Sequence, residues 1–223
     1  RGVLTVRDAT VTSTRLGITV GDGGDSASLD LEGASLVQSA SEFFVGASGG
    51  AATVTLTGNA ADTPAQIIVP GLLGIGLSAT ESSVTLVRNA TLNAGEIIVG
   101  GEAPGLLSIL ENSVVTSPTT TVRAEGLLIG EVALPNKQAS GSDEPNLVGD
   151  LIVEEGGRVR IRAGSAPALR VSGNATLGGT LEVEFADEAG LAEGTTIRLL
   201  QVDGNATGEF TEVDFPSRSP DFD

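Results

Sequence analysis

The side chains of this 223-residue chain that could do chemistry are carboxylates, arginines and hydroxyls, because the chain contains no histidine and no cysteine. A Ser-His-Asp triad, a thiolate nucleophile and the usual nitrogen and sulfur ligands of zinc, copper and iron are therefore excluded. Tyrosine and tryptophan, which would stack on sugar rings, are absent as well. We expect a protein that is not an enzyme and needs no cofactor, with calcium as the one metal to consider.

Three arginines form a candidate binding surface. Arg158, Arg160 and Arg162 alternate with apolar residues, so on a strand they would share the outer face as a basic ridge. Such a ridge could bind an acidic polysaccharide, which would make the chain a polysaccharide-active enzyme. The simpler interpretation is a solvated face on which the arginines pair with glutamates of neighbouring coils: Glu154, Glu155 or Glu182.

Two aspartates are the only candidate metal ligands that the motifs suggest. Asp22 and Asp25 stand in a Gly-Asp-Gly-Gly-Asp segment over residues 21–25. Turns of this composition supply the oxygen ligands that calcium prefers. The segment occurs once, whereas calcium-binding repeats need several copies, so an ordinary glycine-aspartate turn accounts for it better.

The elements that must position these side chains are marked by a recurring column of turn-forming residues. Each follows an apolar strand by two or three positions and precedes a small residue; the eight are Asp8, Gly33, Asn59, Asn89, Asn112, Gly156, Asn174 and Asn205. Asn, Asp and Gly tolerate a left-handed backbone, so each can turn the chain sharply. Repetition at this spacing is typical of stacked repeat folds.

Short strands with alternating apolar residues lie between the turns. A first set precedes the column at residues 4–6, 29–31, 54–56, 84–86, 107–109, 151–153 and 169–171, and a second follows at 18–21, 43–46, 67–70, 97–100 and 127–130. A third, very short set contains Val11, Leu36, Leu92, Val115 and residues 159–161. The period of two predicts strands with one buried face. Three short strands per coil predict an all-β parallel β-helix, which we favour over an antiparallel sandwich.

Stacked coils would place equivalent residues above one another. Asn59, Asn89 and Asn112 are the best candidates for a ladder of side-chain amides. Residues 70–81 and 132–149 interrupt the repeat as insertions, and loops of this kind often carry binding functions. Three Asn-Ala-Thr sequons begin at Asn89, Asn174 and Asn205; they could carry glycans, although the turn repeat also explains them.

The last part of the chain departs from the repeat. We divide the sequence into coils at 1–165, terminal coils with a cap at 166–216, and a linker or tail at 217–223. Phe185, Phe210 and Phe215 are expected to plug the end of the stack, because an open coil exposes unpaired strand edges and core.

The repeats resemble the passenger stems of bacterial autotransporters and related secreted β-helical proteins. The segments that carry the resemblance are GVLTVRDATV, LGITVGDG, SLDLEGASL, FFVGASGG, ATVTLTGNA and SVTLVRNATLNAGEIIVG, and residues 169–216 resemble the passenger's closing segment. The resemblance implies a right-handed parallel β-helix, an extracellular or cell-surface location, and a C-terminal cap that helps the helix to fold. It transfers no catalytic residue to this chain.

The net charge and the lengths of the apolar runs limit which binding partners the chain can have. The net charge of -17 repels nucleic acid and anionic lipid, and no apolar run approaches the length that crosses a bilayer. We expect a rigid structural stalk or scaffold that contacts neighbouring domains of a longer chain. The alternatives are a filament or matrix subunit that binds itself through the ends of the solenoid, and an adhesin that binds through residues 132–149.

Overall fold

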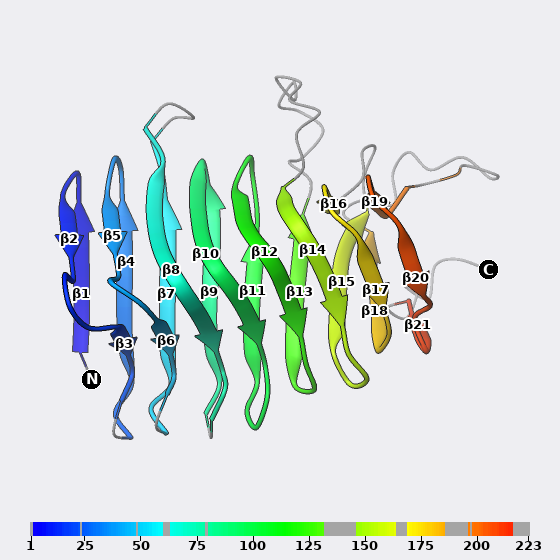
Figure 1. The fold of residues 1–223 in the computed structure, drawn as a ribbon, viewed down its shortest axis with the longest axis horizontal. Helices are drawn as coiled ribbons and strands as arrows, with labels where there is room; N and C mark the ends of the chain where they lie inside the picture. Colours follow the sequence, from blue (N-terminus) through cyan, green and yellow to red (C-terminus); the bar gives the residue numbers. More distant parts are fainter. Residues whose placement is uncertain are drawn as a thin grey trace, which may run out of the picture.

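The computed structural model is all-β in the residues that it describes, which are 2–22, 24–47, 49–59, 63–78, 80–131, 146–163, 169–185, 196 and 198–215. Every strand pairing in this part of the chain is parallel. The strands stack in sequence order along the long axis of the molecule (Figure 1). The expectation of stacked parallel strands is therefore confirmed.

The first sheet has nine strands, and we call each pass of the chain from this sheet through the second and back a coil. Consecutive strands of the sheet come from consecutive coils, so the chain returns to the same sheet once per coil. The strands are β1 (Gly2–Arg7), β4 (Ala27–Glu32), β7 (Ala52–Thr57), β9 (Ser82–Arg88), β11 (Gly105–Ile109), β13 (Gly126–Glu131), β15 (Arg158–Ala163), β18 (Thr180–Phe185) and β21 (Glu212–Asp214).

The second sheet has twelve strands. Two short strands per coil form it at both ends of the stack, and one long strand per coil forms it in the middle. The short strands are β2 (Thr10–Thr12), β3 (Ile18–Val20), β5 (Leu36–Gln38), β6 (Phe43–Val45), β16 (Leu169–Val171), β17 (Ala175–Leu177), β19 (Leu200–Val202) and β20 (Ala206–Gly208). The long strands are β8 (Ala65–Ile75), β10 (Ala90–Val99), β12 (Val114–Val122) and β14 (Leu147–Val153).

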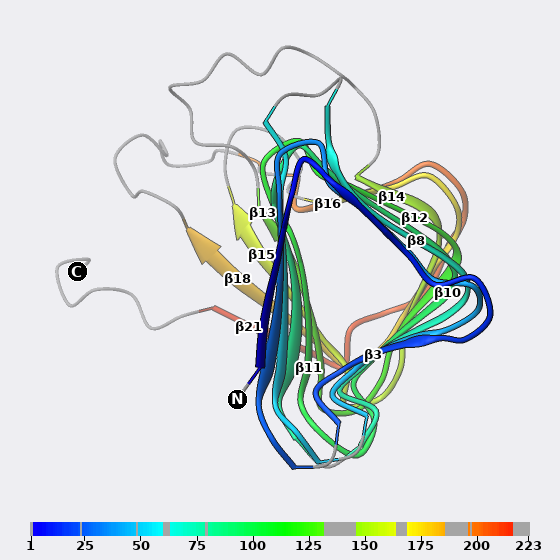
Figure 2. The same ribbon diagram turned by 90° about the vertical axis from the view of Figure 1, so that its left-hand side faces the viewer.

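The long strands bend instead of breaking. The pairing of β10 with β8 shifts register between Ala94 and Glu96, and that of β12 with β14 shifts between Thr116 and Thr119. A shift of this kind is a β-bulge, which inserts an extra residue and bends the strand. The bend lets one strand cover two sides of the coil, and Figure 2 shows the coils superimposed around a common interior.

The expected insertion at residues 70–81 is wrong for its first half. Residues 70–75 belong to β8, where Leu73 pairs with Phe43 on one side and with Ile97 on the other. Residues 67–69, predicted to be the equivalent of 43–45, instead continue the strand that pairs with β5. Proline usually marks the end of a strand, because it cannot donate a ladder hydrogen bond. Pro70 lies within β8 at an exposed position at the bend, where no such bond is needed.

Four other strand assignments change sheets. Residues 159–161, expected in the third set with Val11 and Leu36, lie in β15 of the first sheet, whereas Val11 and Leu36 lie in the second. Residues 127–129 pair with β11 and β15 in the first sheet, although we expected them in the second set. Residues 151–153 and 169–171, expected in the first set, lie in the second sheet. Alternation of apolar and polar residues is the same in both sheets, so it cannot distinguish them.

The core is a column of apolar side chains that runs through the stack. In the first sheet the inward positions are Leu4, Leu29, Val54, Val84, Leu107, Leu128, Val159, Leu181 and Val213, each paired with the next. The interior members are at most 8% exposed, whereas Leu4 is 53% and Val213 48% exposed. Each buried side chain stabilises the fold by roughly 1.5–3 kcal/mol.

Some expectations fall outside the described residues. Residues 132–145 of the second expected insertion are among these, while its last three residues, 147–149, begin β14. The tail at 217–223 is outside as well. Both sheets continue across the expected boundary at residue 165, because β15 pairs with β18 and β14 with β16. Among the described residues, no helix has the length and hydropathy to span a membrane.

Candidate functional site

The basic ridge lies on β15 and faces the glutamates of β18, because the two strands pair in parallel with Arg160 opposite Glu182. Nη1 of Arg158 is 3.3 Å from Oε1 of Glu182, and Nε of Arg160 is 2.7 Å from Oε2 of the same carboxylate. Nε of Arg160 also lies 3.4 Å from Oε1 of Glu184. The arginines are thus paired with the next coil, as the simpler interpretation predicted. Arg162 pairs through its backbone with Glu184, and its side chain is outside the described residues.

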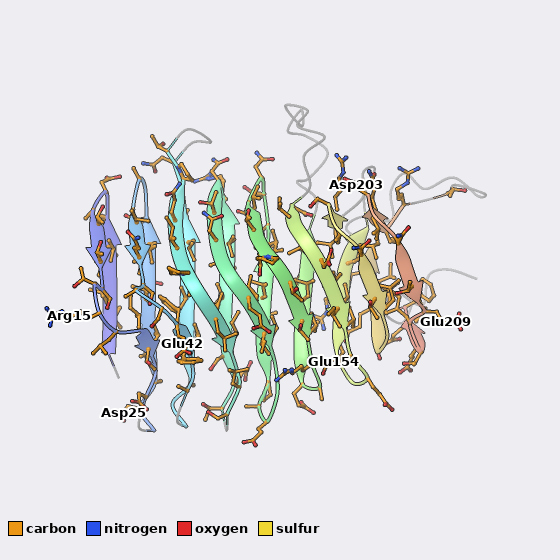
Figure 3. All side chains as sticks on the ribbon, viewed as in Figure 1. Arg15, Asp25, Glu42, Glu154, Asp203 and Glu209 are labelled. Carbon is orange, nitrogen blue, oxygen red and sulfur yellow. The ribbon has the colours of Figure 1, made fainter. Side chains whose placement is uncertain are left out.

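Other arginines link adjacent coils in the same way. The pairs are Arg7 with Glu32 at 2.5 Å, Arg123 with Glu154 at 3.9 Å, and Arg170 with Asp203 at 3.3 Å. Charged side chains project along the whole outside of the stack, from Arg15 near one end to Glu209 near the other (Figure 3). Exposed pairs of this kind contribute about 0.2–1 kcal/mol each, so their role is to hold register rather than to supply most of the stability.

Asp203 has a perturbed pKa. Its Oδ1 accepts a hydrogen bond from Nε2 of Gln201 at 3.1 Å, and Arg170 donates to both of its oxygens. The hydrogen bond from Gln201, followed by the hydrogen bond and charge of Arg170, lowers the pKa of Asp203. The carboxylate is therefore held in its charged form at the corner that follows β19.

The eight turn residues do not form one column, because they occupy three different corners of the coil. The first corner, between the first sheet and the second, contains Asp8, Gly33, Asn59, Asn89 and Asn112. The second corner, within the second sheet, contains Asn174 and Asn205, and the third corner, where the chain returns to the first sheet, contains Gly156. Every corner needs a sharp turn, so the same residue types serve all three.

At the first corner, Asp8 and Gly33 are matched to each other across adjacent coils. Oδ1 of Asp8 accepts a hydrogen bond from the backbone N–H of Ala34 at 2.9 Å. Gly33 has a φ of +70°, and a Cβ there would collide with Oδ1 of Asp8. Only glycine therefore permits this approach of the carboxylate to the next turn.

The predicted amide ladder of Asn59, Asn89 and Asn112 is wrong. The three residues follow adjacent strands of the first sheet, and Asn89 and Asn112 both have positive φ values of 44° and 59°. Gly58, and not Asn59, is in register with Asn89, because Gly58 donates to the carbonyl of Arg88. Within the described residues, no hydrogen bond joins the three side chains.

A different ladder exists at the second corner, where a side-chain oxygen of one coil accepts a hydrogen bond from a backbone nitrogen of the next. Its first member, Asp150, was missed by the sequence analysis. Oδ1 of Asp150 accepts hydrogen bonds from the backbone nitrogen of Asn174 at 2.7 Å and from its Nδ2 at 3.2 Å. Oδ1 of Asn174 in turn accepts from the backbone nitrogen of Asn205 at 3.0 Å. The dipeptide Gly-Asp or Gly-Asn, which begins at residues 149, 173 and 204, was the available signal.

Of the three phenylalanines predicted to cap the stack, only Phe210 packs against the core in the described residues. Phe210 is half-buried and packs against the core, whereas Phe215 is 58% exposed, so its predicted role as a plug is wrong. Phe215 lies past the end of β21, where no further coil covers it in the described residues. The backbone of Phe185 pairs with Ala163, and its side chain is outside the described residues.

Asp22 and Asp25 lie in the loop between β3 and β4, at the third corner. Across the ranges that the structure describes, no group of three or more aspartates and glutamates is placed to hold a metal ion. Searches against protein-family models, curated proteins and solved structures found no match. The geometry of the described residues therefore carries the functional argument.

Proposed function

We propose that the chain is a non-catalytic structural protein, a right-handed parallel β-solenoid with three sides per coil and a C-terminal β cap. It acts as a rigid stalk or scaffold outside the cell or on its surface. The observation that carries this proposal is the unbroken inward column from Leu29 to Leu181, which stays at most 8% exposed through the stack. Each coil buries its apolar face only against its neighbours, as in repeat proteins.

Contacts between coils support a stiff rod. Backbone hydrogen bonds, the Asp150–Asn174–Asn205 ladder and the ion pairs of Arg158 and Arg160 all join one coil to the next. Nine strands at a spacing of about 4.8 Å extend over about 40 Å. Side chains that mainly join one coil to the next are what we expect in a protein that serves as a rigid spacer.

The extracellular location rests on the resemblance of the repeats to autotransporter passenger stems. The acidic surface, with a net charge of -17, is in keeping with a protein that must stay soluble and avoid anionic partners. The same resemblance assigns the terminal coils to capping, which the packing of Phe210 on the core supports.

Duplication of coils tests the proposal. A variant with a second copy of residues 27–81, two complete coils, should fold, and its maximum dimension in X-ray scattering should grow by about 10 Å. Its midpoint of urea unfolding should match or exceed that of the parent. A glycine-serine insertion of equal length at the same place is the control and should lower the midpoint. Loss of cooperative unfolding in the duplicated variant would contradict a solenoid.

End-to-end association is a second candidate, and the exposure of Leu4 supports it. Leu4 is 53% exposed although its partners in the column, Leu29 and Val54, are 4% and 1% exposed. The edge of β1 could pair with a strand from another copy or from a neighbouring domain. Light scattering should show concentration-dependent growth that Leu4→Lys abolishes, while Thr5→Lys, on the outer face of the same strand, changes it less. A monomer at all concentrations would exclude self-association.

A further inference from the structure

Two identical tetrapeptides, Gly-Asn-Ala-Thr, occupy the second corner of adjacent coils. They contain the sequons of Asn174 and Asn205, and a third sequon begins at Asn89 at the first corner. The Asn-x-Thr sequence is what N-glycosylating enzymes read. Because the two tetrapeptides have the same sequence, any difference between them as acceptors comes from their surroundings.

The Asn89 sequon is closed to an enzyme in the folded protein. Ala90 is 0% exposed, and the hydroxyl oxygen of Thr91 is buried without a hydrogen-bond partner. The strand β10 that carries them pairs with β8 on one side and β12 on the other. An enzyme could therefore reach neither the threonine hydroxyl nor the backbone.

In the Asn174 sequon, Asn174 and Thr176 are exposed, but Ala175 is 1% exposed and the carboxamide of Asn174 is engaged at both ends. Nδ2 donates to Oδ1 of Asp150 at 3.2 Å, and Oδ1 accepts from the backbone nitrogen of Asn205 at 3.0 Å. The following strand, β17, pairs with β14 and with β20, so both of its edges are occupied.

The Asn205 sequon differs in each of these respects. Asn205, Ala206 and Thr207 are all exposed, and within the described residues no hydrogen bond involves the carboxamide of Asn205. The strand β20 pairs only with β17 in the described part, and all three of its residues, Ala206–Gly208, are exposed. The hydroxyl of Thr207 makes only long contacts, each of 3.4 Å, to Thr176 and Ala175.

We propose that Asn205 is an acceptor site for N-linked glycosylation. The donor is an oligosaccharide joined through pyrophosphate to a lipid, and an oligosaccharyltransferase catalyses the transfer. Nδ2 of Asn205 forms a bond to the anomeric carbon of the sugar, and the bond from that carbon to the pyrophosphate oxygen breaks. Nδ2 loses one proton to a base of the transferase. The lipid pyrophosphate leaves with the electron pair. Acceptor competence does not depend on the proposed stalk function, although modification in the cell requires the extracellular route.

The test treats the purified, folded chain with an oligosaccharyltransferase that reads Asn-x-Thr and its lipid-linked donor, and maps the products by mass spectrometry. We expect Asn205 to be modified at least tenfold more than Asn174, and Asn205→Gln to remove the major product. Asp150→Ala frees Nδ2 of Asn174, the nitrogen that would be modified, while Oδ1 still accepts from Asn205, and it should raise modification at Asn174. A synthetic Gly-Asn-Ala-Thr peptide confirms that the enzyme is active.

Equal modification of Asn174 and Asn205, or no modification of Asn205 while the peptide is modified, would overturn the proposal. Far-UV circular dichroism of each variant shows whether it still folds, so that loss of glycosylation can be distinguished from loss of the β-solenoid fold. A chain that keeps its β spectrum but accepts no glycan at Asn205 refutes the acceptor site and leaves the structural function standing.

Discussion

Oδ1 of Asp150 lies 2.7 Å from the backbone nitrogen of Asn174, the residue at the same corner one coil later. The carboxylate therefore supplies a hydrogen-bond acceptor to the turn at Asn174, the residue directly before β17. Asn174 repeats the arrangement toward Asn205, which makes the second corner a relay of side-chain acceptors from coil to coil. Such contacts fix the position of each coil relative to the last, which apolar packing alone does not do.

Asp150→Ala should lower the free energy of unfolding by about 1 kcal/mol, because two hydrogen bonds to Asn174 are lost and water replaces them only in part. Urea denaturation monitored by circular dichroism measures the change. Asp150→Asn keeps an acceptor oxygen at the same place and should lose less than half as much. An alanine variant as stable as the wild type would show that the ladder does not stabilise the corner.

Glu182→Gln should lower the free energy of unfolding by about 0.5–1 kcal/mol at low salt, since it weakens the ion pairs with Arg158 and Arg160. The difference should shrink in 1 M sodium chloride, because salt screens partly exposed charges. Glu184→Gln is the matched control; among the described side chains Glu184 forms an ion pair with Arg160, at 3.4 Å, and its removal should have a smaller effect. A loss independent of salt would point to packing instead of charge.

Asp203 predicts a specific dependence of stability on pH. Its pKa in the folded chain is lowered from the ordinary value of 3.8 by Gln201 and Arg170. A carboxyl with a lowered pKa stabilises the fold above its unfolded pKa and loses that contribution as pH falls through its folded pKa. The difference in unfolding free energy between wild type and Asp203→Asn should thus be constant from pH 5 to 7 (about one to three pH units above the unfolded pKa) and diminish below about pH 4. A difference that grows on acidification would refute the assignment.

Thr120→Val should raise the free energy of unfolding by up to about 1 kcal/mol. Thr120 is 0% exposed and lies between Ile97 and Leu151, two buried residues of the second sheet. Its hydroxyl oxygen has no hydrogen-bond partner in the described structure. An unpaired buried hydroxyl is unfavourable, and valine has nearly the same shape. Thr116→Val, on the outer face of the same strand, should change stability by less than about 0.5 kcal/mol. A destabilised Thr120→Val variant would mean that the hydroxyl is hydrogen-bonded in solution.

Much of the fold could be predicted from particular residues. The alternation at 29–31, 54–56 and 84–86 identified inward positions that the structure buries. Asp8 and Gly33, and likewise Asn89 and Asn112, were recognised as turn residues, and each pair stacks in successive coils. The candidate site was predicted less well. Arg158 and Arg160 were found from their spacing, but their pairing with Glu184 as well as Glu182 depends on the register of β15 and β18.

The sequence by itself determined that parallel strands stack with one face inward, because alternation with period two and turn-forming residues are local properties that need no knowledge of the partner strand. Only the tertiary structure decided which corner each turn residue occupies. Leu151 and Leu169 look like first-sheet residues in sequence, yet lie in the second sheet, where they pair in register with Thr120 and Leu200. Register between distant segments is a long-range property, and for that reason the Asp150–Asn174–Asn205 ladder could be seen only once the coils were stacked.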